Sequence, residues 1–233
     1  MEQKKLEIKK YINVSPKLRE NYKSLRVNID FCKNTPRVIL LTSSIPGEGK
    51  STVSIHLAAE IAKSGKKVLM LDVDMRKSKW FELFGLPKRD RKGVSDYLVG
   101  QISLSDALWQ TDEPNLYLLL SGTIPPNPTE LLGSEAFGNL LFACKEIFDY
   151  VIIDAPPLSG IIDTAVICSK CDGVLFVIES DTVSCRVVKK ALQQIERAGG
   201  IVLGAVLNKL KLSNRALYGT YGTSRYYYTN YQP

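Results

Sequence analysis

The sequence predicts an α/β fold in which a mostly parallel β-sheet carries helices on both faces, and three observations support this class. Short apolar runs alternate along the chain with stretches of helical pattern. The runs are almost continuously apolar, as strands buried on both faces are. The composition, 45% hydrophobic and 24% charged over 233 residues, is that of a globular domain. We expect strands at residues 38–41, 67–71, 115–120, 150–154, 173–179 and 201–207.

The expected helices fall between these strands. A helix at 15–31 precedes the first strand, with Ser15 as its N-cap and Pro16 in its first position. On the residues alone it is an amphipathic packing helix with an apolar face of Leu18, Tyr22, Leu25 and Ile29. The remaining helical stretches are 51–63, 135–148 and 183–198, short pieces within 77–110, and the end of a proline loop at 122–134.

The segment 44–51, which reads SIPGEGKS, has the layout of a phosphate-binding loop between a buried strand and a helix. Such a loop points backbone N–H groups at phosphate oxygens, aided by the positive end of the helix. Lys50 would reach the phosphates and the Ser51 hydroxyl would ligate Mg²⁺. The pattern's first glycine is replaced by Ser44. The alternative is a glycine-rich turn that binds nothing. Gly47 and Gly49 are expected to have positive φ angles.

Acidic residues follow two of the expected strands. Asp72 and Asp74 end the run 67–71, and their spacing places both carboxylates on one side of an extended backbone. Asp154 ends the run 150–154. Ligands bind beyond the carboxyl ends of the strands in open α/β sheets, so these acids are candidate site residues. The alternative is a solvated acidic turn.

The net charge of +7 is unevenly distributed. Residues 1–37 hold ten Lys and Arg against four Asp and Glu, and residues 197–233 hold five against none, so the middle is mildly acidic. Basic ends could meet nucleic acid, anionic lipid or the acidic surface of another copy. The five cysteines do not indicate a disulfide framework, and Cys168 and Cys171 are interpreted as buried thiols. No apolar run is long enough to span a bilayer and residues 1–11 are too lysine-rich for a signal peptide, which predicts a cytoplasmic protein.

The last twenty residues, 214–233, differ from the rest of the chain. They contain six tyrosines among Gly, Ser, Thr and Asn, with two arginines and no aliphatic cluster that could form a core. We therefore expect one folded domain at 1–213 and a disordered tail at 214–233. The tail tyrosines are Tyr218, Tyr221, Tyr226, Tyr227, Tyr228 and Tyr231.

Taken together, these features resemble the bacterial tyrosine kinases (BY-kinases) of capsule and exopolysaccharide synthesis, in particular the cytoplasmic subunit that works with a separate membrane adaptor. The resemblance covers nearly the whole chain. It rests on the tyrosine-rich end and on five motifs: PGEGKST (46–52, Walker A), VLMLDVDMR (68–76, Walker A′), VIIDAPP (151–157, Walker B), PPNPTELLGS (125–134) and ENYKSLR (20–26). It implies a P-loop NTPase fold and an ATP- and Mg²⁺-dependent protein-tyrosine kinase that phosphorylates its own tail tyrosines.

The resemblance also implies a role for each matched residue. Lys50 neutralises the transferring phosphoryl group, and Asp72 orients and deprotonates the tyrosine, with the division between Asp72 and Asp74 left open. Phosphoryl transfer needs this positioning and charge neutralisation more than covalent catalysis. The implied Mg²⁺ ligands are Ser51 directly and Asp74 and Asp154 through water. The implied nucleotide contacts are Gly47, Glu48, Gly49, Lys50, Ser51, Thr52 at the α-phosphate, and Asn208 with Lys209 at the adenine.

Partners follow from the same resemblance. The family's Glu-x-x-Arg-x-x-Arg helix motif mediates ring-like self-association; here Glu20 and Arg26 match it and Lys23 replaces the first arginine, losing its planar fork. A transmembrane adaptor would recruit the chain to the inner face of the membrane and activate it. A cognate tyrosine phosphatase and protein substrates of polysaccharide synthesis are also expected, and nucleic acid is not.

Two other classes compete with this interpretation. Positioning and partitioning ATPases of the MinD/ParA type share the fold, but they carry a second lysine early in the phosphate loop, where this chain has Ile45. They also end in a membrane helix or a DNA-binding surface rather than in tyrosines. A DNA- or lipid-binding module using the basic ends would leave the three acids without a role.

Overall fold

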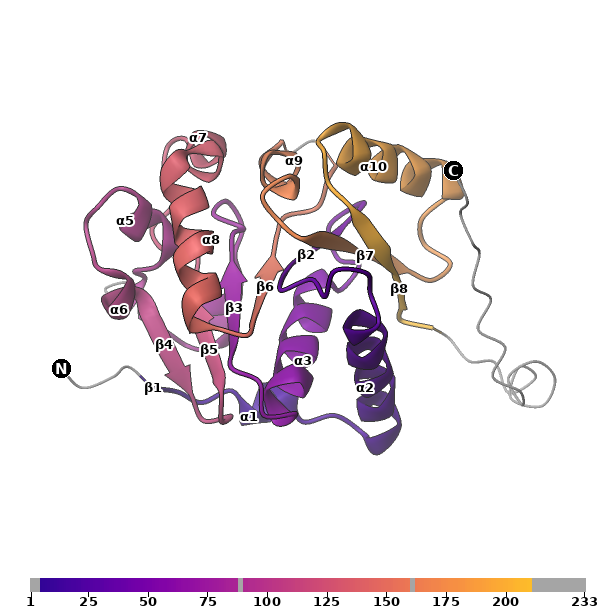
Figure 1. Cartoon of the computed structure of the whole chain (residues 1–233), viewed down its shortest axis with the longest axis horizontal. Helices are drawn as coiled ribbons and strands as arrows, with labels where there is room; N and C mark the ends of the chain where they lie inside the picture. The colour runs from indigo at the N-terminus through magenta and orange to yellow at the C-terminus, as the bar shows by residue number, and fades with distance from the viewer. Residues whose placement is uncertain (1–4, 88–89, 160–161, 211–233) are drawn as a thin grey trace.

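The computed structural model describes residues 5–87, 90–159 and 162–210, and within them the chain forms one sheet with helices on both faces (Figure 1). The sheet has eight strands in the order β1-β4-β5-β3-β6-β2-β7-β8. All the strand pairs are parallel except β4 with β5. The strands are β1 Lys5–Leu6, β2 Val38–Ser43, β3 Val68–Asp72, β4 Leu108–Thr111, β5 Leu116–Leu119, β6 Tyr150–Asp154, β7 Gly173–Glu179 and β8 Val202–Asn208.

The helices divide between two apolar layers, one on each face of the sheet. One layer contains buried residues of α1 (Lys9–Ile12), α2 (Pro16–Asp30), α3 (Lys50–Lys63) and α4 (Trp80–Leu83). The other layer contains buried residues of the later helices. These are α5 Val94–Leu98, α6 Leu104–Ala107, α7 Pro128–Gly133, α8 Glu135–Ile147, α9 Asp163–Cys168 and α10 Cys185–Arg197.

Strand β2 shows why the apolar runs were continuous. Ile39 and Leu41 enter the first layer while Val38 and Leu40 enter the second, because successive side chains of a strand point to opposite faces. All six residues of β2 are buried. The predicted α/β class, with a mostly parallel sheet covered on both faces, is therefore confirmed.

The expectation that strands alternate with helices throughout was wrong at one edge of the sheet. Residues 108–111 form the strand β4, which pairs antiparallel with β5 through Trp109 and Leu118, at the end of the stretch 77–110 that was expected to hold short helical pieces. Strand β1 then pairs with the outer side of β4. Both strands are short, four and two residues, so their apolar patterns are too brief to separate from those of short helices.

Helix α2 begins at the predicted residue, but its buried face is shorter than predicted. The Ser15 hydroxyl accepts the N–H of Leu18 at 3.4 Å, and Pro16 is the first helical residue. Tyr22 and Ile29 are buried, but Leu18 is 40% exposed, so the apolar face starts one turn later than predicted. Tyr22 packs on His56 of α3, with ring centroids 5.0 Å apart.

None of the described helices is long and apolar enough to cross a bilayer. The predicted domain boundary at residue 213 and the six tail tyrosines lie outside the described residues.

Candidate nucleotide site

The phosphate loop connects β2 to α3 and has the backbone shape that its glycines predict. Gly47 and Gly49 have φ angles of 92° and 91°, and Gly49 is the N-cap of α3. Ser44 is not among the described residues with positive φ, so a side chain is tolerated where the usual pattern has glycine. Its carbonyl accepts the N–H of Ser159 at 3.0 Å, which ties the loop to the segment after β6.

Glu48 supports this loop from within. Its side chain is fully buried, and its carboxylate accepts the N–H of Ile45 at 2.8 Å and that of Glu179 at 3.2 Å. One carboxylate thus holds the first half of the loop against the end of β7. The resemblance implied that Glu48 contacts the nucleotide. In the structure the Glu48 side chain supports the loop, and its backbone N–H belongs to the phosphate-binding segment.

Asn208 and Lys209, at the end of β8, hold the loop from the other side. The Asn208 amide donates to the carbonyl of Glu48 at 2.9 Å, and the Lys209 ammonium donates to that of Gly47 at 2.7 Å. A Cβ at Gly49 would lie 2.1 Å from the Asn208 amide nitrogen. A side chain at residue 49 would therefore displace the Asn208 amide from the Glu48 carbonyl, and the φ angle of 91° also favours glycine.

The three predicted acids come together at the carboxyl ends of β3 and β6. Asp72 and Asp154 are direct partners in the parallel register, so their side chains share one face of the sheet. Both are buried, and Asp74, just past β3, is nearly so. The N–H of Asp74 donates to Asp72 Oδ1 at 3.0 Å. Asp154 ends β6, the neighbour of β2, whose end begins the phosphate loop, and Asp72 and Asp74 lie one strand further away.

Asp72 is held by three donors. Besides the N–H of Asp74, the Ser78 hydroxyl donates to Asp72 Oδ2 at 2.5 Å and the N–H of Ser121 at 3.3 Å. Burial, followed by the nearby charge of Asp154, raises the pKa of Asp72 to about 7. Ser78, in the segment after β3, was not anticipated from the sequence.

Asp154 faces the phosphate-loop helix. Burial raises its pKa, and the Lys50 charge, the Ser51 hydroxyl and the Trp80 indole offset only part of that effect. The indole N–H of Trp80 donates to Asp154 Oδ2 at 3.0 Å, whereas Oδ1 is buried with no hydrogen-bond partner among the described residues.

Other predicted side chains take their places around these groups. The Lys50 ammonium lies 3.4 Å from the Ser51 hydroxyl, at the first turn of α3. Thr52 is exposed beside them. Asp74 Oδ1 accepts the N–H of Lys77 at 3.0 Å, which closes the turn after β3.

A side-chain network that the sequence did not reveal links two of the motifs to Asp163. Arg76 of the second acidic motif donates to buried Asp163 at 2.8 Å from Nε and 3.2 Å from Nη2, and Nη2 also lies 3.2 Å from the Thr129 hydroxyl. Thr129, from the proline-rich motif, donates to the same carboxylate. Burial opposes ionisation, but the bonds from Arg76 and Thr129 hold the pKa of Asp163 below its usual value. An acid nine residues beyond Asp154 was the available signal.

The predicted oligomerisation residues pair within α2. Lys23 Nζ lies 2.7 Å from Glu20 Oε1, and Arg26 Nη1 lies 2.9 Å from Asp30 Oδ2. Asp30 also accepts the Tyr150 hydroxyl at 2.9 Å, so Arg26 is connected to the start of β6. Asp30 is a further residue that the sequence did not single out.

Comparison with known proteins identifies the family. An AAA domain model matches residues 36–201. The tyrosine-protein kinase CpsD of Streptococcus agalactiae is 40% identical over 206 residues, which cover 88% of this chain and 89% of that protein. The chain belongs to the bacterial tyrosine kinases. Tyrosine-protein kinase YwqD of Bacillus subtilis is 36% identical over 88% of this chain and 86% of its own length. The resemblance found in the motifs is thereby confirmed.

Solved structures agree with this family. The chimerical protein CapA2B2 matches with a TM-score of 0.80 and 34% identity over 89% of this chain and 93% of that one. A cobyrinic acid a,c-diamide synthase from Mycobacterium smegmatis, solved with an ATP analogue and magnesium, has a TM-score of 0.63 at 25% identity over 73% and 72% of the two chains. MinD from Pyrococcus horikoshii, at 23% identity and a TM-score of 0.63 over 77% and 72%, shares the fold alone.

Proposed function

We propose that this bacterial tyrosine kinase transfers the γ-phosphoryl group of ATP to tyrosine hydroxyls, those of its own C-terminal segment included, and so regulates capsular or exopolysaccharide synthesis and export. The observation that carries the proposal is the pair of buried carboxylates in register, Asp72 and Asp154, of which Asp154 interacts with Lys50 and Ser51 at the start of α3. Family membership supports the tyrosine acceptor.

Magnesium suits the donors at this edge of the sheet. No group of three or more His, Cys, Asp or Glu among the described residues could hold a metal alone. Mg²⁺ in phosphoryl-transfer sites typically takes one or two carboxylates together with substrate phosphates and waters. Ser51, Asp74 and Asp154 would form the protein's share, and the unpartnered Asp154 Oδ1 is an acceptor of the required kind. When bound, the ion neutralises charge on the phosphate oxygens.

The remaining steps, which are phosphate binding, proton transfer and positioning of the nucleotide, use side chains and N–H groups of this chain. Lys50 offsets the charge of the transferring group, and the loop N–H groups from Gly47 to Ser51 and the Thr52 hydroxyl hold the phosphates. Asp72, held in place by Ser78 and Asp74, accepts the tyrosine proton. Asn208 and Lys209 position the adenine end of the nucleotide while they support the loop.

The tail tyrosines serve as substrate on a neighbouring copy. The segment 214–233 carries two arginines and no acid, which favours its approach to the three carboxylates. Each phosphate adds about −1.5 to −2 charges at pH 7. Two or three phosphates would make the segment acidic, so that like charges repel it from Asp72, Asp74 and Asp154 and loosen the ring.

The experiment mixes two chains. A Lys50→Met chain supplies intact tyrosines, and an active chain with its six tail tyrosines changed to Phe supplies the kinase. Mass spectrometry is expected to find phosphate on Tyr218, Tyr221, Tyr226, Tyr227, Tyr228 or Tyr231 of the Lys50→Met chain. Phosphorylation of an added tyrosine polymer shows that the active chain is competent. If the active chain phosphorylates the polymer but not the Lys50→Met chain, transfer between chains is refuted. If phosphate is found only on Ser or Thr, the tyrosine acceptor is refuted.

Ring assembly is proposed to use α2. Glu20 and Arg26 would exchange their partners within the helix, Lys23 and Asp30, for groups of a second copy. The Glu20→Ala/Arg26→Ala variant is therefore expected to sediment as a monomer under conditions where the unaltered chain forms a larger species. Lys17→Ala, at an exposed position of the same helix, is the control. Equal sedimentation of the two variants would show that Glu20 and Arg26 of α2 do not form the interface.

We also propose three kinds of protein partner. A transmembrane adaptor on a separate chain would recruit the kinase to the inner face of the membrane, and its cytoplasmic segment is expected to raise phosphate incorporation by the purified chain. No increase with that segment would contradict the adaptor. A cognate tyrosine phosphatase would reverse tail phosphorylation, and proteins of polysaccharide synthesis would be further substrates.

A further inference from the structure

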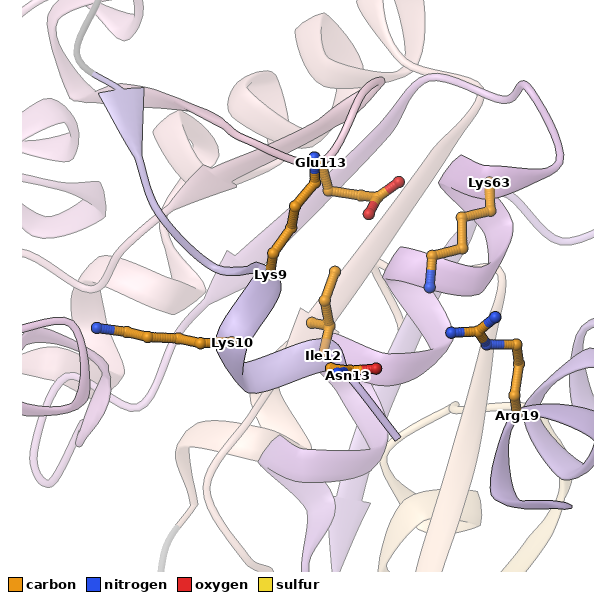
Figure 2. A pocket seen from close by; sticks show the side chains of 7 residues that line it. All are labelled: Lys9, Lys10, Ile12, Asn13, Arg19, Lys63 and Glu113. Carbon is orange, nitrogen blue, oxygen red and sulfur yellow. The ribbon is translucent and has the colours of Figure 1, made fainter. Parts of the chain in front are cut away.

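The basic N-terminal region of the chain forms one wall of a pocket (Figure 2). The pocket has a volume of about 440 Å³ and lies between α1, the start of α2, the end of α3 and the β4–β5 turn. Its lining residues are Lys9, Lys10, Ile12, Asn13, Arg19, Lys63 and Glu113. Helix α3 has 14 residues, so its last turn lies about 20 Å from its first, where the phosphate loop ends.

The pocket gathers more cations than carboxylates. Four of its seven lining residues are Lys or Arg and one is acidic. Arg19 Nε is buried and has no hydrogen-bond partner among the described residues. Lys63 Nζ forms an ion pair with Glu60 Oε2 at 3.8 Å, and Glu60 is not among the lining residues. Figure 2 shows the side chains of Arg19 and Lys63 extending into the same space from two different helices. Like charges brought together in this way repel unless an anion joins them.

Hydrogen bonds and packing hold the α1 side of the pocket. Asp112 Oδ1, in the β4–β5 turn, accepts the N–H of Ile8 at 2.7 Å and that of Lys9 at 3.2 Å. Ile8 and Ile12, which flank the lysines, are buried in the core. The start of α1 is thus anchored to the turn that carries Glu113.

We propose that this pocket binds a compact phosphate-bearing anion. A phosphate group offers several acceptor oxygens and up to two negative charges, which match converging ammonium and guanidinium donors. Arg19 provides a planar fork suited to phosphate. The lining side chains include no aromatic ring on which a nucleobase could stack, which favours a ligand without a base. The Asn13 amide adds a neutral donor and acceptor for a hydroxyl-bearing portion of that ligand.

The test measures binding to the full chain and needs no kinase activity, so its outcome is separate from that of the proposed function. The phosphate loop is first filled with a non-hydrolysable ATP analogue and Mg²⁺. Inorganic phosphate is then titrated while backbone amide resonances of residues 8–13 and 60–63 are followed by NMR. We expect saturable shifts of these amides. The Arg19→Gln/Lys63→Gln variant should weaken the apparent affinity at least tenfold, because it removes the charge-assisted hydrogen bonds of two cations to the phosphate.

The matched control is Lys17→Gln/Lys66→Gln, which removes the same charge from exposed positions near the same two helices and outside the pocket. It should bind phosphate as the unaltered chain does. If Arg19→Gln/Lys63→Gln fails to fold by circular dichroism, Lys9→Gln/Lys10→Gln takes its place. Absence of saturable shifts, or equal weakening by pocket and control variants, overturns the proposal.

A second arm identifies the source of the phosphate. Co-sedimentation with vesicles of phosphatidylcholine containing phosphatidic acid is compared with co-sedimentation with phosphatidylcholine alone. Binding to the anionic vesicles that the pocket variant loses and the control variant keeps assigns the pocket to a lipid headgroup. Amide shifts with inorganic phosphate in the absence of such vesicle binding assign it to a soluble phosphate compound.

Discussion

Replacing Lys50 with Met is expected to abolish tyrosine phosphorylation while the chain stays folded. Lys50 stands at the first turn of α3, where its ammonium group lies beside the Ser51 hydroxyl and its charge acts on Asp154. It is the cation placed to offset the charge that develops on the transferring group. Loss of one such electrostatic contact typically costs about 10²–10³-fold in rate. We expect at least that loss, measured as phosphate incorporation into tyrosine with radiolabelled ATP.

The matched control is Lys66→Met, an exposed lysine just beyond the other end of the same helix. This variant should phosphorylate tyrosine at the rate of the unaltered chain. Thermal unfolding of both variants verifies that the sheet and α3 are intact. Wild-type phosphate incorporation by Lys50→Met would show that the phosphate loop is not the site of transfer.

The second large effect is expected from Arg76. The Arg76→Ala variant leaves the carboxylate of Asp163, which is 1% exposed, without two of its donors. A buried acceptor left unpaired costs about 1–3 kcal/mol. We expect the lower part of that range because Arg76 is itself 43% exposed and Thr129 still donates to the carboxylate. Urea unfolding gives the change in stability, and steady-state kinetics are expected to show a loss of kcat of at least tenfold.

A double variant separates stability from positioning. Arg76→Ala/Asp163→Asn removes the uncompensated charge and is expected to regain stability relative to Arg76→Ala. Activity should remain low, because the fork that joins the turn after β3 to the proline-rich motif is still missing. Arg76→Lys keeps the charge without the two-pronged geometry, and its activity should lie between that of Arg76→Ala and that of the unaltered chain. If Arg76→Ala/Asp163→Asn recovers kcat together with stability, the network has a structural role only.

The sequence alone determined those features that depend on near neighbours in the chain. Gly47 and Gly49 indicated the positive φ angles of the phosphate loop, and both are found. The run Tyr150–Asp154 became a strand with the predicted bounds, because a short, continuously apolar segment between turn residues has few other ways to be buried. Asp72, Asp74 and Asp154 were placed at the ends of strands by the same local reasoning.

The tertiary structure decided which distant residues meet. Asp72 and Asp154 become register partners because β6 inserts beside β3, and strand order is not written in either segment. The support that Glu48 receives from β7, and the bond from Trp80 to Asp154, depend on the same arrangement. Local patterns report which face of an element is apolar, whereas these contacts arise from the packing of elements far apart in the chain. The sequence therefore predicted the groups that carry the chemistry, and the packed sheet decided what holds each of them in place.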